Sequence, residues 1–476
     1  MEIDVNIPFL SARELTAAYA AGDLTPSHVV KCLIERIELL NPKINAIVAL
    51  DTDVMREEAS RSTDRWTASA PLSNFDGVPF IVKDAINVRG LPTSWGSRAF
   101  ADYHPEADEL PVARLRAAGG VVVGKANVPE FTLRGFTHND LHGVTRNPWD
   151  VRLTPGGSSG GAVAAVAAGF APLALGTDAG GSIRRPAGFT GLVGFKPSAG
   201  RVPRLDTLPA IVAEYEVIGP IARTVEDAVL CLEIIAEPDS RDRQSINFPY
   251  PVVSGPLGTV RDGLRILLIE EFRGLPVDHE VAASVREAAG RLERLGHRIE
   301  VAEAPFDTRA FGKSFGAISK AGLARVFQDR PWKGLVTPEF AEAIKAGETV
   351  TGVEYATALE VLREAREEIA SVFGRYDLLM TPSSGTLPWP AGERDHKSIN
   401  GQPVEGGEHS VFTGFANVTG CPAISIPGPA TENGFPIGFQ LVAPFAADGL
   451  LLHLARQFEA NFPWPTDSGF GESARP

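Results

Sequence analysis

The chain has 476 residues, of which 44% are hydrophobic and 22% charged, a composition typical of a folded globular protein with a sizeable core. Its 45 basic and 59 acidic residues give a formal net charge of −14 at pH 7, and a surface of that sign repels nucleic acid and anionic lipid. Neither is expected as a partner, and the Arg184-Arg185 pair is too short a basic cluster to change that.

The first 70 residues predict an N-terminal helical region. Residues 1–4 have neither a basic nor an apolar stretch, so no signal peptide is expected. Ser11-Ala-Arg-Glu14 is a capping box, and Thr25-Pro26 offers an N-cap followed by proline at the first helical position. Apolar residues then recur at helical spacing up to Leu40. A strand at 44–50 and a helix at 51–66 are predicted next.

Residues 75–235 predict an alternating α/β core. An apolar strand at 77–83 ends on Lys83, a helix follows at 107–118, and a valine-rich strand follows at 120–124. Residues 156–177 contain no charge, which is almost enough for a membrane span. That stretch is mostly alanine and glycine and contains Pro172, so a buried helix is favoured over a span.

The second half of the chain continues the alternation of strands and helices. Residues 236–262 have no periodicity and predict a surface crossing. Strands are predicted at 264–269, 377–380, 423–426 and 437–442, and helices at 279–295, 352–374 and 446–460. No linker forces a split, so we expect one α/β domain over residues 1–476, with a mixed β-sheet core covered by helices on both faces.

Cysteine usage points to a reducing compartment. The chain has three cysteines, Cys32, Cys231 and Cys421, which are far apart and have no metal-binding spacing. We therefore expect a cytoplasmic protein that uses no metal and no cofactor.

Two serines, each within a glycine-rich segment, are the basis for predicting a serine nucleophile and an oxyanion site. Ser158 lies in Pro155-Gly-Gly-Ser-Ser-Gly-Gly161, and Ser182 lies in Thr177-Asp-Ala-Gly-Gly-Ser-Ile-Arg184. Glycine allows backbone to approach a ligand closely, so the amides of residues 179–182 (Ala179, Gly180, Gly181 and Ser182) can converge on an oxyanion. A serine nucleophile also needs a base. His138 and His142 show no Asp–His arrangement, whereas Lys83 ends an apolar run in which burial would lower its pKa. Taken alone, a lysine after a strand is more often a salt-bridge partner, so these residues by themselves leave both roles of Lys83 open.

The chain resembles the amidase signature hydrolases over most of its length. The resemblance rests on the two serine motifs, on Gly124-Lys-Ala-Asn-Val-Pro-Glu130, on Gly194-Phe-Lys-Pro197 and Gly200-Arg-Val-Pro203, and on Gly434-Phe-Pro-Ile-Gly-Phe-Gln440. It departs from many members at Val163, Thr190 and Ser198, none of which belongs to the implied catalytic set.

The resemblance implies a Ser–cis-Ser–Lys triad. Ser182 would be the nucleophile, Ser158 would relay the proton after a cis Gly157–Ser158 bond, and Lys83 would be the base. Supporting roles fall to four residues: Ser159 and Thr177 would hydrogen bond near the triad, while Asp178 and Arg184 would fix the loop as charges rather than take part in the chemistry.

Other patterns suggest rival chemistries. Gly157-Ser-Ser159-Gly-Gly161 matches a nucleophile elbow with Ser159 as nucleophile and His453 as partner, but prolines interrupt the approach and a packed histidine is favoured. The segment 119–126 resembles a P-loop without its Ser/Thr, so a strand and turn are favoured.

The expected substrate is a small amide, with water as the second reactant. Six aromatic residues in 300–350, a segment that varies in this family and tends to cover the site, favour an apolar or aryl amide, unless they only pack helices together. They are Phe306, Phe311, Phe315, Phe327, Trp332 and Phe340. Ester or carbamate (urethane) cleavage and a glutaminase-type subunit of a tRNA-dependent amidotransferase stay open. The oligomeric state is not predicted.

Overall fold

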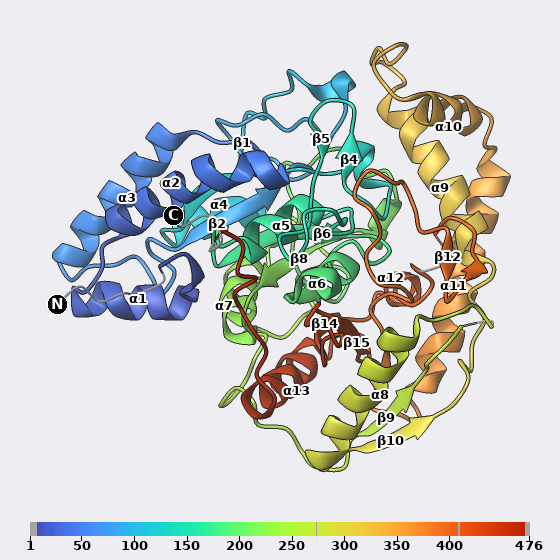
Figure 1. Ribbon diagram of the computed structural model, residues 1–476. Coiled ribbons are helices and arrows are strands. Elements are labelled where there is room, and N and C mark those ends of the chain that lie inside the picture. The colour runs from blue at the N-terminus through green and yellow to red at the C-terminus, as the bar shows by residue number, and fades with distance from the viewer. Residues whose placement is uncertain (1–6, 273, 408–409, 472–476) are drawn as a thin grey trace.

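Figure 1 shows the computed structural model, which describes residues 7–272, 274–407 and 410–471. An eleven-stranded sheet runs through the middle of the described chain in the order β1-β3-β2-β6-β8-β7-β14-β15-β11-β9-β10. Its strands are β1 (Ile47–Ala49), β2 (Pro79–Lys83), β3 (Val121–Ala126), β6 (Leu173–Asp178), β7 (Val193–Lys196), β8 (Val217–Ala222), β9 (Arg265–Leu268), β10 (Arg298–Val301), β11 (Leu378–Pro382), β14 (Ala423–Pro427) and β15 (Gly438–Val442).

The sheet is mixed, as the sequence predicted. Strand β2 pairs in parallel with β3 and β6, and β9 does so with β10 and β11. Between these two parallel groups, β8, β7, β14 and β15 pair antiparallel with their neighbours. Two small ribbons lie outside the sheet: β4 (His138–Asn139) with β5 (Gly143–Val144), and β12 (Ser398–Ile399) with β13 (Gln402–Pro403).

Helices cover both faces of the sheet. One face packs against α4, α7, α8 and α13, the other against α2, α5 and α6, while α9, α10 and α11 lie at one end (Figure 1). The helices are α1 (Ala12–Ala21), α2 (Pro26–Ile44), α3 (Thr52–Thr67), α4 (Leu110–Ala117), α5 (Gly160–Ala167), α6 (Arg184–Thr190), α7 (Val225–Ile235), α8 (His279–Arg294), α9 (Phe311–Val326), α10 (Pro338–Glu348), α11 (Gly352–Val372), α12 (Gly414–Val418) and α13 (Asp448–Asn461).

Local sequence accounts for the N-terminal helices. The Ser11 hydroxyl accepts from the Glu14 amide while Glu14 reaches back, which is the predicted capping box. Thr25 caps α2 at its start, and Asn45 in the left-handed conformation ends it. Because α2 continues to Ile44, the strand predicted at 44–50 begins only at Ile47. Residues 1–4, on which the signal-peptide prediction rests, lie outside the described residues.

The alternation of side chains along β2 decides where Lys83 lies. Phe80 and Val82 pack into the core on the α4–α7 face, whereas Ile81 packs with α5 on the opposite face. Successive side chains of a strand point to opposite faces, so Lys83 shares the face of Ile81. The end of β2 therefore directs its lysine toward the N-terminal end of α5.

The uncharged stretch from 156 to 177 is core, as predicted. Helix α5 is buried along its whole length, and β6 is buried beside it. In the described part of the chain, no helix has the length and hydropathy that a membrane crossing requires.

Candidate active site

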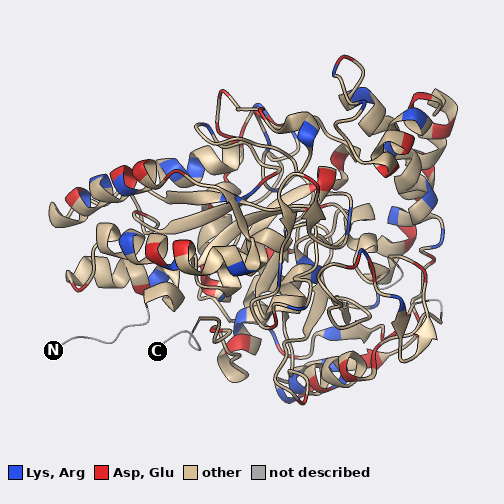
Figure 2. Ribbon diagram, turned by 45° about the horizontal axis from the view of Figure 1, so that its top comes forward, with Lys and Arg blue, Asp and Glu red and all other residues tan. Residues whose placement is uncertain are grey.

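Charged residues gather on the outer helices and are sparse along the central strands (Figure 2). Lys83 on β2, Asp178 on β6 and Arg184 at the start of α6 place charged groups in the interior, each with 0% relative exposure. Burying a charged group is costly unless it is paired, hydrogen bonded or neutralised. Asp178 pairs with Arg184 at 2.8 Å, and Lys83 Nζ lies 3.1 Å from the carbonyl of the adjacent Thr177. The ends of β2 and β6 therefore define the candidate site.

Lys83 is held by oxygen acceptors rather than by a carboxylate. Its Nζ lies 2.7 Å from Ser158 Oγ, 2.8 Å from Thr177 Oγ1 and 3.1 Å from the Thr177 carbonyl. Burial lowers the pKa of Lys83 to about 7, although the negative charges of Glu216 and Asp178 act in the opposite direction. A lysine with that pKa is about half deprotonated at neutral pH and can accept a proton.

Ser158 lies just before α5 and directly after Gly157. The segment packs so closely against backbone that only glycine fits at position 157. The Gly157–Ser158 peptide bond is cis, as the resemblance implied. A Cβ atom on Gly157 would lie 2.4 Å from the Phe136 carbonyl oxygen, so any side chain there would collide with backbone. Close packing of the loop against Phe136 thus fixes the position of Ser158.

Ser182 lies between the end of β6 and the start of α6. The Ser159 amide donates to the Ser182 carbonyl at 3.1 Å, and Ser159 Oγ donates to the Thr177 carbonyl at 3.3 Å. These bonds join the segment around Ser158 to the segment around Ser182. Ser182 is 8% exposed whereas Ser158 is 1% exposed, so only the outer serine is open to a substrate.

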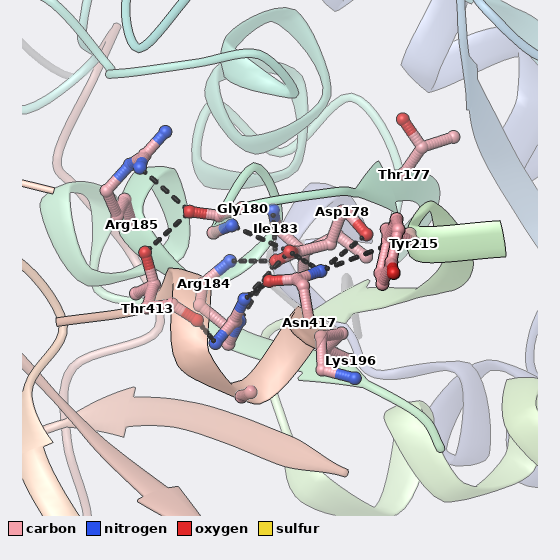
Figure 3. Close-up of polar contacts among 12 residues, drawn as sticks. Thr177, Asp178, Gly180, Ile183, Arg184, Arg185, Lys196, Tyr215, Thr413 and Asn417 are labelled. Atoms are coloured by element: carbon pink, nitrogen blue, oxygen red, sulfur yellow. Dashed lines mark hydrogen bonds and ion pairs between the residues drawn. The ribbon is translucent and has the colours of Figure 1, made fainter. Parts of the chain in front are cut away.

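An ion pair holds the loop between β6 and α6 (Figure 3). The Asp178 carboxylate accepts from the Arg184 side chain at 2.8 and 3.0 Å and from the Ile183 amide at 3.0 Å. Burial would raise the pKa of Asp178, but the Arg184 guanidinium holds it far below its usual range. Arg184 also donates to Asn417 Oδ1 and Gln440 Oε1, both at 2.6 Å, which ties the loop to the C-terminal half.

One of the four amides predicted to hold the oxyanion is already engaged. The Gly181 amide donates to Asp178 Oδ1 at 2.7 Å, so it can serve an oxyanion only as a shared donor. Gly181 has φ of +116°, and a Cβ atom there would lie 2.2 Å from Thr413 Oγ1. Open space lies beside Gly180. The amides of Ala179, Gly180 and Ser182 remain the predicted donors.

A cavity of about 330 Å³ opens at the same edge of the sheet. Ala85, two residues beyond Lys83, and Val217, the register partner of Asp178, line it. Trp95 and Leu208 contribute apolar surface to its wall. Its polar lining includes Arg204, Glu214, Glu216, Asp242 and Gln244. The cavity wall is therefore partly apolar and partly charged, with three carboxylates and one guanidinium.

The six aromatic residues of the 300–350 segment divide into two groups. Phe306, Phe311 and Phe315 pack with residues of β9, β11 and α11, as the packing alternative predicted. Phe327 and Phe340 are buried and Trp332 is partly buried in a second cluster, which also contains Trp95 and Phe131 and packs against Ala179. Only this second group adjoins the predicted oxyanion loop.

Several residues of the site had no recognisable motif. Thr413 and Asn417 come from the segment before β14, and Glu216 directly precedes β8. Arg185 appeared in the sequence only as part of a short basic pair. Gln440 is the exception, because it ends one of the segments that carried the resemblance.

In the described ranges, no three His, Cys, Asp or Glu side chains gather as a metal site would require.

The rival patterns do not form the structures that they require. Residues 151–159 contain no strand before Ser159, and His453 lies on α13, where its Nδ1 accepts from the Gly258 amide at 3.2 Å. The P-loop-like segment from 119 to 126 is a turn followed by β3.

Comparisons with known proteins identify the family of the chain. The family model described as Amidase matches residues 28–452. An acylamidase of Rhodococcus erythropolis is 35% identical over 472 residues, covering 97% of this chain and 98% of that protein. A glutamyl-tRNA(Gln) amidotransferase subunit of Symbiobacterium thermophilum is also 35% identical, over 477 residues, covering 94% and 96%.

Solved structures show the same fold. A bacterial aryl acylamidase of the amidase signature family superposes with a TM-score of 0.90 at 27% identity, covering 99% of this chain and 100% of that one. A 6-aminohexanoate cyclic dimer hydrolase complexed with substrate superposes with a TM-score of 0.87 at 30% identity, covering 97% and 98%. The chain therefore belongs to the amidase signature family and is an amide hydrolase.

Proposed function

We propose that the protein hydrolyses carboxamides through an acyl-enzyme on Ser182, with Ser158 as proton relay and Lys83 as base. The contact of 2.7 Å between Lys83 Nζ and Ser158 Oγ, made by a buried lysine whose pKa is about 7, carries this proposal.

The first half of the reaction forms the acyl-enzyme. Ser182 Oγ attacks the carbonyl carbon of the amide while its proton passes to Ser158 Oγ, and the Ser158 proton passes to neutral Lys83. The carbonyl oxygen becomes an oxyanion, which backbone amides of the 179–182 loop stabilise; each such donor contributes about 3 kcal/mol. When the C–N bond breaks, the proton returns from Lys83 through Ser158 to the leaving amine.

The second half releases the acid. Water takes the place of the amine, gives its proton to Lys83 by the same relay, and attacks the ester carbonyl. The Ser182–acyl bond breaks, Ser182 recovers its proton, and the carboxylic acid leaves. Thr177 keeps Lys83 aimed at Ser158 throughout, since its hydroxyl and carbonyl are the lysine's other two partners.

A second buried lysine is a poorer candidate for the base. Lys125, on the adjacent strand β3, forms an ion pair of 3.0 Å with Asp84 and donates to Thr93 Oγ1 at 2.6 Å. Burial lowers the pKa of Lys125, but the Asp84 carboxylate beside it acts in the opposite direction and stabilises its charged form. Within residues 7–272, 274–407 and 410–471, Lys83 contacts no carboxylate, and its Nζ lies 2.7 Å from the Ser158 hydroxyl.

For the substrate, we propose an amide with an apolar or aryl portion. The apolar wall of Trp95 and Leu208 supports this, as do the acylamidase and aryl acylamidase among the relatives. Burying an aromatic ring contributes about 2 kcal/mol, or roughly a thirtyfold preference. Esters and carbamates offer the same carbonyl to Ser182 and are secondary candidates.

The cytoplasmic location stays a prediction.

A glutaminase-type subunit of a tRNA-dependent amidotransferase is the second candidate. Relatives named as glutamyl-tRNA(Gln) amidotransferase subunits match this chain at 35% identity over more than nine-tenths of its length. The two functions differ in substrate and in dependence on partners. Ammonia release from glutamine, measured beside amine release from aryl amides with the isolated chain, separates them.

The test uses p-nitroanilides, p-nitrophenyl esters and carbamates with the wild-type chain and two serine variants. A fluorophosphonate should label Ser182, and Ser182→Ala should abolish both labelling and turnover. Ser159→Ala is the matched control, because it removes a neighbouring hydroxyl and should still be labelled. Labelling at Ser159 in the wild type, or turnover of glutamine alone, would overturn the proposal.

A further inference from the structure

A groove of about 700 Å³ lies beside the end of α9 and the loop that leads to α10, at the top right of Figure 1. That volume is in the range of small-molecule sites. Its residues include two aromatic rings, Phe327 and Trp332, and three cations, Arg325, Arg330 and Lys333. None of them lines the cavity of about 330 Å³ at the candidate site, which we call the catalytic cavity. This second hollow is the α9–α10 groove.

The charge of the α9–α10 groove is opposite to that of the whole chain. Three cations and one carboxylate, Glu348, line it, whereas the chain has a net charge of −14. In the part of the chain that the structure describes, none of the three cations forms an ion pair. Arg325 lies in the last turn of α9, where the helix dipole stabilises a cation, but Arg330 and Lys333 lie beyond the helix. Like charges around one groove repel one another, so the groove favours an anionic ligand.

The aromatic rings of the groove favour a flat ligand. The Arg330 guanidinium carbon lies 4.2 Å from the centroid of the Phe100 ring, a cation–π contact that holds this cation in place. An arginine stacked in this way keeps the N–H donors at its edge for a carboxylate. Trp332 is half-buried, so part of its indole is open to a second ring. A planar aromatic carboxylate matches both the open indole and the cations.

A chain of ring contacts connects the groove with the catalytic cavity. Phe327 packs edge-on against Phe131 with 5.5 Å between the ring centroids, and Phe131 packs in the same way against Trp95 at 5.7 Å. Trp95 in turn lines the catalytic cavity. The groove is therefore separate from the cavity but is built on the same aromatic cluster.

We propose that the α9–α10 groove is a second, non-catalytic binding site for an aromatic carboxylate. Amide hydrolysis releases a carboxylic acid, and the acid of an aryl amide combines a flat ring with one negative charge. The enzyme's own product then has the chemistry that the groove recognises. The identity of this acid as the product rests on the proposed aryl substrate, whereas the binding site itself does not depend on Ser182 as nucleophile.

Calorimetric titration of the full chain with 2-naphthoate tests the site. We expect a dissociation constant below about 1 mM, and an affinity that falls as salt is added, because the cations are partly exposed. Two probes each lack one half of the ligand: 2-naphthylmethanol has no charge, and acetate has no ring. Each should bind at least about tenfold more weakly. Tighter binding of AMP than of 2-naphthoate would overturn the carboxylate assignment.

Variants of the cations locate the site. Arg330→Gln and Lys333→Gln should each weaken 2-naphthoate binding about fivefold, and the double variant about 10- to 30-fold, as expected for charged contacts at a partly exposed site. Lys345→Gln is the matched control, because it removes a cation of α10 that does not line the groove, and it should bind as the wild type does. Equal binding by the wild type and the double variant would refute the proposal.

The catalytic cavity is the competing location, since a product acid can return to the site that formed it. The chain labelled with a fluorophosphonate should bind 2-naphthoate as the unlabelled chain does. Loss of binding on labelling, or complete competitive inhibition with a constant equal to the calorimetric one, would place the acid in the catalytic cavity and refute the second site. A chain that reacts with no fluorophosphonate would contradict the proposed role of Ser182, and the cation variants would still decide whether the groove binds the acid.

Discussion

The pH dependence of acylation follows from the burial of Lys83. Burial lowers the pKa of Lys83 from 10.5 to about 7. At pH 7 the neutral fraction then rises from about 0.03% to about half, a gain of roughly a thousandfold in active base. Below pH 7 the lysine holds its proton and cannot accept one, so kcat/KM should fall about tenfold per pH unit; above pH 7 it should level off.

Glu216 provides the perturbation that tests this assignment. Its negative charge raises the pKa of Lys83, so Glu216→Gln should move the acidic limb of the profile to lower pH. Glu214→Gln is the matched control, because Glu214 lines the same cavity but is half exposed and pairs with Arg366 at 3.4 Å. That variant should leave the limb in place.

The assay is kcat/KM for a p-nitroanilide between pH 5 and about 10, which reports groups of the free enzyme. A limb near pH 10, a rate that falls as pH rises, or an equal shift in both variants would contradict a neutral Lys83 base. Unfolding measured at each pH separates loss of base from loss of structure.

Four further outcomes are expected. Ser182→Ala should lower kcat/KM by about 10⁴-fold or more with an unchanged circular dichroism spectrum; adduct formation at Ser159 would count against it. Asp178→Asn should cost about 3–5 kcal/mol in urea unfolding, because it leaves the Arg184 charge buried and unpaired; a stability equal to wild type would contradict that. Phe340→Ala should cost about 3 kcal/mol and leave KM for aryl amides unchanged if its ring is only core; a raised KM at constant melting temperature would place it in the pocket. EDTA should not change the activity, and loss restored by zinc would overturn the metal-free mechanism.

The sequence alone determined the elements that have strong local patterns. The capping box at Ser11, the proline after Thr25 and the helical spacing up to Leu40 predicted α1 and α2, because capping and amphipathicity act within a few residues. The apolar run before Lys83 predicted β2. Strands β6, β7 and β8 were not distinguished, because strands buried on both faces do not alternate apolar and polar residues.

The glycine-embedded serines indicated where the candidate site lies, because close backbone approach restricts which residues fit there, and the resemblance to the amidase signature hydrolases implied Lys83 as the base. Only the tertiary structure decided how that site is completed. It brought Arg184 against Asn417 and Gln440, which lie far along the chain in the C-terminal half. It also showed that Arg185 lacks a carboxylate partner among the described residues, since a charge is paired or unpaired only through what the folded chain places around it.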